Sequence, residues 1–302
     1  MRVILIHNPK AGAGKPSARA LETLFEKAGH QVLYTSTEDA DWENRLREPA
    51  DAVVIAGGDG SVGLAAPRIA ERGLPFCVLP LGTANNIAKS LNEDRPIEEI
   101  VATLDMAEER SVDLGMVAGC RSSQPFIESV GVGLMVELVR RNFRMPGTRE
   151  RNPAVERKSA LRHLLEFSEE YGGVECELQL DEQKLSGRYL LVEVMNMGLI
   201  GPNLPLVPYA NAGDGRLDVV CVEVRQRRRL KNYLERLSAD KHATLAVGAR
   251  QCRRAEIHCS KPVLHVDDAA FDSAVAVVEV KGAALRFLEP TDTRRDAWIP
   301  PP

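Results

Sequence analysis

Short apolar runs alternate with amphipathic segments over the first hundred or so residues of the chain. Four of the runs predict buried strands, at residues 2–7, 31–36, 52–56 and 76–79. Between the first two, residues 16–28 carry apolar side chains three and four positions apart, which predicts a helix. Strands that alternate with helices are typical of a doubly wound, mostly parallel α/β sheet. Ligands bind such a sheet beyond the carboxyl ends of its strands.

The pattern changes after about Asp113, where apolar runs follow one another through short turns. This pattern favours a largely antiparallel, β-rich sandwich. Its predicted strands cover residues 125–132, 175–180, 188–196, 216–224, 255–259, 263–266, 274–280 and 284–288. Two helices are predicted within it, at residues 154–171 and 227–238. We therefore expect two domains, residues 1–112 and residues 113–302, with the last strand or the tail packing back onto the first domain.

The composition is that of an ordinary globular protein, with 44% hydrophobic and 27% charged residues. The formal net charge of −4 gives no support for a nucleic-acid partner, because nucleic-acid binders carry a basic excess. The six cysteines show neither a CxxC pair nor a zinc-like spacing, so we expect free thiols in a reducing compartment. No run approaches the roughly 18 apolar residues of a membrane span. We therefore expect a soluble, cytoplasmic protein.

The first glycine-rich loop, NPKAGAGK at residues 8–15, follows the first predicted strand. It falls short of the P-loop pattern, because Pro9 stands where the first glycine belongs and Pro16 where Ser or Thr belongs. A strand, a glycine-rich loop and a helix in succession still indicate a concave, phosphate-facing turn.

The second glycine-rich loop, GGDGSVG at residues 57–63, follows the third predicted strand. It matches GxGxxG, but the next strand ends without the acidic residue that a dinucleotide fold uses to bind ribose. A carboxylate among phosphates would be repelled unless a cation lay between them. Asp59 therefore indicates a nucleotide bound with Mg²⁺. The alternative is a tight turn in which Asp59 caps the following helix.

A third loop, PLGTANN at residues 80–86, follows the fourth predicted strand. Together with the first two loops, and with VDLG at 112–115, PYA at 208–210 and GDGRLD at 213–218, it resembles the family of diacylglycerol kinases, sphingosine kinases and bacterial lipid kinases. The resemblance covers most of the chain, with the motifs in the family's order. It implies ATP and Mg²⁺ as cofactors and a lipid as the substrate.

The resemblance also implies roles for individual residues. The first loop would border the nucleotide through Asn8, Pro9, Lys10, Gly12 and Lys15. The second loop would hold the phosphates and Mg²⁺ through Gly57, Gly58, Asp59, Gly60 and Ser61, and the third would complete the cleft with Gly82, Thr83 and Asn85. Asp214 resembles a position that binds a structural Mg²⁺ in some bacterial members, although Gly-Asp-Gly is also an ordinary turn.

Transfer of a phosphoryl group to a lipid hydroxyl calls for a carboxylate that accepts the proton. The family carries Asp-Gly-Glu after a strand near the C-terminus, where this chain has Asp267, Asp268 and Ala269. The resemblance implies Asp267 as the base, and a register shifted by one residue makes Asp268 the alternative. The changed Gly and Glu indicate an unusual substrate, or weak or absent activity.

The predicted function is therefore ATP-dependent transfer of the γ-phosphate to a lipid hydroxyl. Two alternatives stay open: an NAD kinase-like enzyme, which shares GGDG, and a non-catalytic protein that binds a nucleotide or a lipid. Diacylglycerol, phosphatidylglycerol, sphingoid bases and undecaprenol-like alcohols all offer a suitable hydroxyl. Two basic stretches, at residues 140–162 and 225–231, predict peripheral contact with an anionic membrane surface at the inner face, with a solvated helix face as their alternative.

Overall fold

The structure, a computed structural model, describes residues 1–119, 122–144 and 152–289. A parallel sheet fills the N-terminal part, formed by β1 (Arg2–His7), β2 (Gln31–Ser36), β3 (Ala52–Gly57) and β4 (Pro75–Pro80). The strands lie in the order β4–β3–β1–β2, and each neighbouring pair is parallel. The α/β class predicted from the alternating pattern is confirmed.

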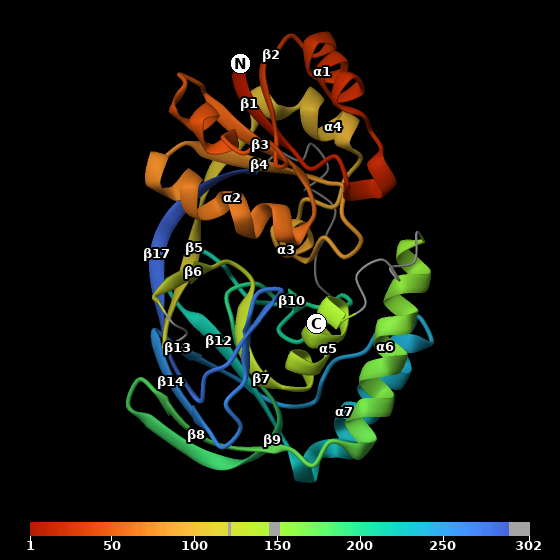
Figure 1. Ribbon diagram of the computed structural model, residues 1–302, viewed down its shortest axis with the longest axis vertical. Coiled ribbons are helices and arrows are strands. Elements are labelled where there is room, and N and C mark those ends of the chain that lie inside the picture. The colour runs from red at the N-terminus through yellow and green to blue at the C-terminus, as the bar shows by residue number, and fades with distance from the viewer. Residues whose placement is uncertain (120–121, 145–151, 290–302) are drawn as a thin grey trace, which may run out of the picture.

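Helices cover both faces of this sheet, as the doubly wound prediction requires (Figure 1). The helices are α1 (Ala18–Lys27), α2 (Asp59–Arg72), α3 (Asn86–Ser90) and α4 (Ile97–Ala102), with 3₁₀ turns at Ala11–Gly14, Trp42–Arg47 and Leu104–Met106. Because successive strand residues point to opposite faces, Val3 and Leu5 of β1 share a core with α1 and α4. Ile4 and Ile6 point the other way and share a core with α2 and α3.

Two long antiparallel strands, β5 (Glu108–Ala118) and β17 (Val275–Glu289), connect the parallel sheet to the rest of the molecule. The end of β17 runs parallel to the start of β4, with Arg286 opposite Pro75 and Phe287 opposite Phe76. Farther back, the same strand pairs with β14 (Arg254–Cys259). One sheet therefore continues through both halves, and residues 112 and 113, where the sequence pattern changes, both lie inside β5.

The C-terminal half is rich in antiparallel strands, as predicted (Figure 1). Its strands are β6 (Gln124–Phe126), β7 (Ser129–Gly133), β8 (Val174–Leu180), β9 (Gln183–Met195), β10 (Leu199–Ile200), β11 (Leu204–Pro205), β12 (Leu217–Glu223), β13 (Ala249–Cys252), β15 (Leu264–Val266) and β16 (Ala269–Phe271). A 3₁₀ turn at Val224–Gln226 precedes the last helix, and the helices are α5 (Leu134–Arg144), α6 (Pro153–Glu170) and α7 (Arg227–Ser238). These three helices share an apolar core with β9 and β12.

Three of the predicted strands differ from the structure. The apolar run at residues 125–132 is divided into β6 and β7, because Ile127 and Glu128 turn their backbone N–H groups toward the side chain of Asp267. The runs at 274–280 and 284–288 form the single strand β17, whose register with β5 is irregular between Lys281 and Leu285. Residues 145–151, within the first basic stretch, lie outside the described residues.

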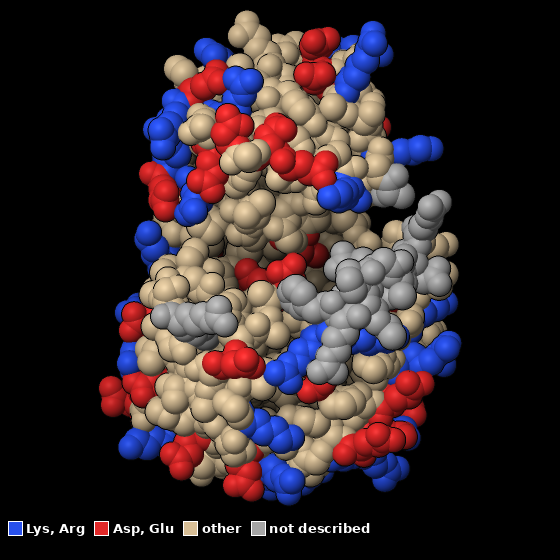
Figure 2. All heavy atoms as spheres, viewed as in Figure 1, with Lys and Arg blue, Asp and Glu red and all other residues tan. Residues whose placement is uncertain are grey.

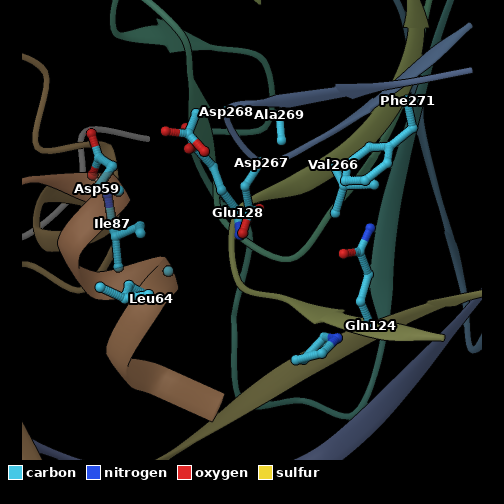
Figure 3. A pocket seen from close by; sticks show the side chains of 13 residues that line it. Asp59, Leu64, Ile87, Gln124, Glu128, Val266, Asp267, Asp268, Ala269 and Phe271 are labelled. Carbon is cyan, nitrogen blue, oxygen red and sulfur yellow. Dashed lines mark hydrogen bonds between the residues drawn. The ribbon is translucent and has the colours of Figure 1, made fainter. Parts of the chain in front are cut away.

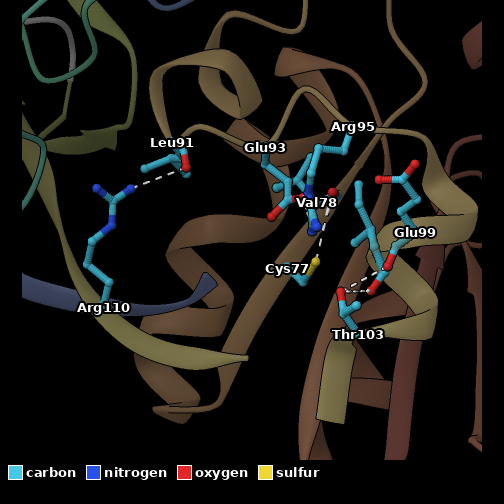
Figure 4. A network of polar contacts seen from close by, with 9 residues as sticks. Cys77, Val78, Leu91, Glu93, Arg95, Glu99, Thr103 and Arg110 are labelled. Atoms are coloured by element: carbon cyan, nitrogen blue, oxygen red, sulfur yellow. Dashed lines mark hydrogen bonds and ion pairs between the residues drawn. The ribbon is translucent and has the colours of Figure 1, made fainter. Parts of the chain in front are cut away.

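A buried carboxylate lies in the loop between α3 and α4 (Figure 4). The side chain of Glu93 is 0% exposed, and its Oε1 accepts hydrogen bonds from the guanidinium of Arg95 at 3.0 and 3.2 Å. Its other oxygen has no hydrogen-bond partner among the described residues. Burial raises the pKa of Glu93 to about 7, although the hydrogen bond and the charge of Arg95 act in the opposite direction.

Candidate active site

The loops that follow β1, β3 and β4 meet at the carboxyl end of the parallel sheet. Asn8 Nδ2 donates a hydrogen bond to Ser61 Oγ at 3.1 Å, which joins the first loop to the start of α2. The backbone N–H of Leu81 donates to the carbonyl oxygen of Gly57 at 2.9 Å, which joins the third loop to the second. The structure thus brings together residues from all three loops that the sequence assigns to the nucleotide.

Close backbone contact makes glycine necessary where the second and third loops meet. A Cβ atom on Gly82 would lie 2.5 Å from the Cα of Gly58, and one on Gly57 would lie 2.4 Å from Ser61 Oγ. A side chain on Gly82 would push the two loops apart, and one on Gly57 would collide with Ser61 of its own loop. Gly60 is exposed in the first turn of α2, where backbone N–H groups lack helical acceptors and can bind anions.

Asn85 fixes the shape of the third loop. Its backbone is left-handed, with φ 52°, and its side chain folds back over the loop. Asn85 Oδ1 accepts a hydrogen bond from the N–H of Gly82 at 2.8 Å, while Nδ2 donates to the carbonyl oxygens of Gly82 and Pro80 at 2.9 and 3.2 Å. Both polar ends of the amide are therefore engaged within the loop, whereas Thr83 is exposed.

The first loop presents its two lysines at the surface. Lys10 Nζ lies 2.5 Å from Glu38 Oε1, with both side chains exposed, and Lys15 is also exposed. Gly12 takes a φ of 57°, and a Cβ atom there would lie 3.3 Å from the carbonyl oxygen of Leu81. The loop conformation therefore depends on Gly12, while Pro9 and Asn8 lie half-buried at its start.

Asp59 is the first residue of α2, but its carboxylate reaches a different helix. Its Oδ1 accepts a hydrogen bond from the backbone N–H of Ile87, at the start of α3, at 2.9 Å. Asp59 therefore caps α3, and it does not cap its own helix as the alternative interpretation had it. Burial raises the pKa of Asp59 above its ordinary value, while the Ile87 N–H and the charge of Lys89 act in the opposite direction.

Asp267 lies on the opposite side of the site, in the turn between β15 and β16. Its Oδ1 accepts hydrogen bonds from the backbone N–H groups of Glu128 and Ser129 at 2.8 and 3.1 Å. Its Oδ2 accepts one from Ile127 at 3.2 Å. Burial raises the pKa of Asp267 to about 6, even though these three N–H groups stabilise the ionised form.

The neighbouring Asp268 is exposed and approaches the start of α2. A Cβ atom on Gly60 would lie 3.2 Å from Asp268 Oδ2, and one on Gly63 would lie 3.6 Å from Asp267 Oδ2. The turn that holds both candidate bases therefore lies against the helix that begins with Asp59. The structure brings these three predicted residues together.

A fourth carboxylate at the site, Glu128, is missed by the sequence interpretation. Its side chain is 8% exposed, and its Oε1 accepts a hydrogen bond from Asn86 Nδ2 at 2.8 Å. Burial, followed by the charges of Asp59 and Asp267, raises the pKa of Glu128 well above its ordinary value. The one signal for it in the sequence is that a charged residue stands inside an apolar run. Burial of an acid costs free energy, so an acid at such a position indicates a function.

These carboxylates line a cavity of about 250 Å³ between the two halves of the molecule. Figure 2 shows acidic side chains in the hollow between the halves, and in Figure 3 Asp268 points toward the helix that carries Asp59. None of the described residues that line the cavity is Lys, Arg or His. Its apolar wall is formed by Leu64, Pro125, Val266 and Phe271.

Asp214, the second predicted metal residue, is not among the residues that line the cavity. Its Oδ1 accepts a hydrogen bond from the N–H of Arg216 at 2.9 Å, and its Oδ2 accepts one from Gln251 Nε2 at 3.3 Å. Among the described residues, no group of three or more His, Cys, Asp or Glu is placed to hold a metal ion. Oxygen donors such as Asp59 suit Mg²⁺, which in nucleotide sites takes one or two carboxylates together with phosphate and water oxygens.

Comparison with known proteins finds matches in both halves. Residues 2–117 match the family described as the diacylglycerol kinase catalytic domain, and residues 143–289 match that described as the YegS C-terminal NAD kinase beta sandwich-like domain. The chain is 24% identical to a diacylglycerol kinase of Mycobacterium tuberculosis, covering 96% of this chain and 95% of that protein. It is also 24% identical to a diacylglycerol kinase of Staphylococcus carnosus, covering 80% and 79%. A crystal structure of a diacylglycerol kinase from Bacillus anthracis has the same fold, with a TM-score of 0.70 at 17% identity over 96% of this chain and 97% of that one.

Proposed function

We propose that the chain is a lipid kinase of the diacylglycerol kinase-like family and transfers the γ-phosphate of ATP to a lipid hydroxyl, because its two halves match the catalytic domain and the C-terminal domain of such proteins. The observation that supports this most is the cavity between the glycine-rich loops and the Asp267 turn. There, a backbone surface suited to phosphates lies beside buried carboxylates and an apolar wall. Phosphoryl transfer to a lipid needs a place for the phosphates, a proton acceptor and a place for the lipid.

In this proposal the triphosphate lies along the loops after β1, β3 and β4. The free N–H groups at the start of α2 and the glycine backbone bind phosphate oxygens without a side chain in the way. Asp59 would hold Mg²⁺ together with the phosphates, and this ion would supply positive charge against the charge that develops on the γ-phosphate. The same positive charge would favour the ionised form of Asp59, against the effect of its burial.

Asp267 accepts the proton of the lipid hydroxyl. A pKa of about 6 suits this task, because the group is ionised at neutral pH and still binds a proton well enough to take it in the transition state. Its Oδ2 accepts a single backbone hydrogen bond, so this oxygen keeps a lone pair for the substrate. Asp268 is the alternative base, since it is exposed at the same turn.

The charge of the cavity supports an uncharged lipid alcohol as the acceptor. Four carboxylates and no described cationic residue line it, so an anionic headgroup such as phosphatidylglycerol would be repelled. The apolar wall, with Leu64 and Phe271, suits the carbon atoms beside the hydroxyl. A diacylglycerol-like alcohol fits both features.

Peripheral contact with an anionic membrane rests on two exposed arginines of α7. None of the helices in the described ranges is long and apolar enough to cross a membrane. Arg228 and Arg229 are exposed, whereas Arg227, the first residue of α7, contacts the end of α6. Arg227 donates hydrogen bonds to the carbonyl oxygens of Ser168, Glu169 and Tyr171. The expected membrane contribution of this stretch is therefore assigned to Arg228 and Arg229.

Kinase assays on Asp267→Asn and on the matched control Asp268→Asn test this function. With ATP, Mg²⁺ and diacylglycerol in mixed micelles, Asp267→Asn should lower turnover roughly 10²–10⁴-fold and leave ATP affinity unchanged, because the phosphates bind other loops. Asp268→Asn should stay within a few fold of the wild type. The reverse ranking would make Asp268 the base. A wild type that phosphorylates NAD and no lipid, or binds ATP without turnover of either, would support the alternative functions.

A further inference from the structure

His265, Gly131 and Glu193 form one row across three neighbouring strands. His265 of β15 lies opposite Gly131 of β7, and Gly131 lies opposite Glu193 of β9. Opposed residues of antiparallel strands project from the same face of a sheet. Because the middle residue is glycine, the two outer side chains meet over its backbone. A Cβ atom on Gly131 would lie 2.3 Å from Glu193 Oε1, so a larger residue at this position would displace the Glu193 side chain from His265.

Both nitrogens of His265 face hydrogen-bond acceptors in the interior of the sheet. His265 is 2% exposed and Glu193 is 0% exposed. Nε2 lies 3.0 and 2.9 Å from the two oxygens of Glu193, and Nδ1 lies 3.0 Å from the backbone carbonyl oxygen of Asp267. A neutral imidazole has one N–H group, so only the protonated ring can donate to both partners.

The balance of charges around the ring agrees with this geometry. The charged groups that face it are Glu193, from β9, and Asp267, from its own turn. Burial is the largest effect and acts to lower the pKa of His265, but the charge and hydrogen bond of Glu193 together with those of Asp267 outweigh it, so the pKa lies above its ordinary value. The two acceptors and the direction of this shift both favour a protonated imidazole beside Glu193.

The turn that this pair supports has an unfavourable backbone conformation. Asp267 has a φ of 48°, which residues with a side chain rarely adopt. Its N–H donates to the carbonyl oxygen of Ser129 at 2.8 Å, and its carbonyl oxygen accepts from His265. These two bonds fix both ends of the residue and so aim its carboxylate.

We infer that Glu193 and His265 are positioning residues. They hold the turn between β15 and β16 in place and keep a positive charge on His265, so that Asp267 is ionised and correctly oriented. The inference rests on the proposed role of Asp267 as proton acceptor. It predicts an effect on the rate of transfer and on the titration of Asp267, and none on the binding of ATP, because the row is on the other side of the cavity from the nucleotide loops.

The substitution Glu193→Gln tests the inference, because it keeps shape and an acceptor oxygen and removes the charge. In the wild type at pH 7, the ¹⁵N spectrum of His265 should be that of an imidazolium, and in the variant that of a neutral ring. The titration midpoint of Asp267, assigned by the loss of its ¹³C signal in Asp267→Asn, should rise by about one pH unit when the nearby cation is lost. The kcat with diacylglycerol should fall roughly tenfold, with KM for ATP within twofold of the wild type.

A matched control is Glu256→Gln, which removes a glutamate 3.9 Å from the exposed His258 on β14 and should change none of these quantities. Gly131→Ala should act like Glu193→Gln, because its methyl group fills the space of the pair. A neutral His265 in the wild type would overturn the inference, and this measurement needs no variant. An unchanged Asp267 titration and kcat in Glu193→Gln would overturn it as well. The NMR measurements need no lipid, so they decide the inference even if the wild type phosphorylates no lipid and the proposed function fails.

Discussion

Replacement of Glu93 by glutamine should change how the stability of the protein depends on pH. The pKa of this buried glutamate is about 7 in the folded protein, against an ordinary value of 4.5. A carboxyl group with a raised pKa binds its proton more tightly in the folded state than in the unfolded state. It therefore stabilises the fold at low pH, and this contribution is lost as the pH rises from about 4.5 through about 7.

The structure sets the size and the sign of this effect. The interval from 4.5 to about 7 corresponds to about 3 kcal/mol, at roughly 1.4 kcal/mol per pH unit. Glutamine keeps the shape of the side chain and an oxygen for Arg95, and it does not titrate. The free energy of unfolding of the wild type, relative to Glu93→Gln, should therefore fall by up to about 3 kcal/mol between about pH 4.5 and pH 8. Asp218 and Asp267 also have raised pKa values, but they are present in both proteins and cancel from the difference.

Urea unfolding followed by circular dichroism at a series of pH values measures this difference. The exposed Glu26→Gln provides a control, because its side chain is solvated whether the chain is folded or not, and its difference from the wild type should be flat. A flat difference for Glu93→Gln would refute the reasoning. A difference that rises with pH would mean that the ion pair with Arg95 outweighs the cost of burial.

Two further predictions concern the nucleotide loop and the membrane surface. Asp59→Asn should abolish kinase turnover but unfold in urea like the wild type, because asparagine still accepts the hydrogen bond from the Ile87 N–H. Asp59→Ala should abolish turnover and also lose about 1 kcal/mol of stability. Full turnover in Asp59→Asn would show that Asp59 has no role in the reaction. The double variant Arg228→Gln, Arg229→Gln should weaken co-sedimentation with anionic vesicles by roughly 2 kcal/mol at low salt. It should lower the melting temperature less than Arg227→Gln does, because the one backbone hydrogen bond it removes is that from Arg229 to the carbonyl oxygen of Ala246. Arg227→Gln should lower the melting temperature, because it removes hydrogen bonds to the end of α6. Vesicle binding that does not weaken with added salt would contradict the proposed role of Arg228 and Arg229.

The three nucleotide loops could be predicted from the sequence because their signals are local. Each of the three loops carries glycine, and the first and third also carry asparagine, at positions where the backbone must turn sharply or approach another loop. Gly58 and Gly82 show this best, since each excludes a side chain at the other. The alternating apolar pattern likewise predicts strands and helices from neighbouring residues alone.

The remaining features of the site depend on contacts between residues far apart in the chain. The predicted strand at 125–132 is interrupted at Glu128 because Asp267, 139 positions later, accepts its backbone N–H, and nothing near Glu128 in the sequence indicates that partner. The sequence around Glu193 is that of an ordinary strand and does not indicate that Gly131 and His265 lie beside it in the fold. Asp59 shows the same limit, since the helix that it caps begins 27 positions after it. Pairings of this kind are set by the register of strands and the packing of helices, which a local pattern does not encode.

Because the end of β17 pairs with β4, the parallel sheet is completed by a strand from the far end of the chain. A fragment ending at residue 117 would keep β1 to β4, yet it would lose the strand that pairs with β4 and the ring of Phe287, whose centroid lies 5.3 Å from that of Phe76. Its β4 edge would be bare and apolar, and bare edges recruit strands from other molecules. The stretch that matches the catalytic-domain family, residues 2–117, therefore lacks a strand of its own sheet, and we expect a stable fragment to need the far end of the chain as well.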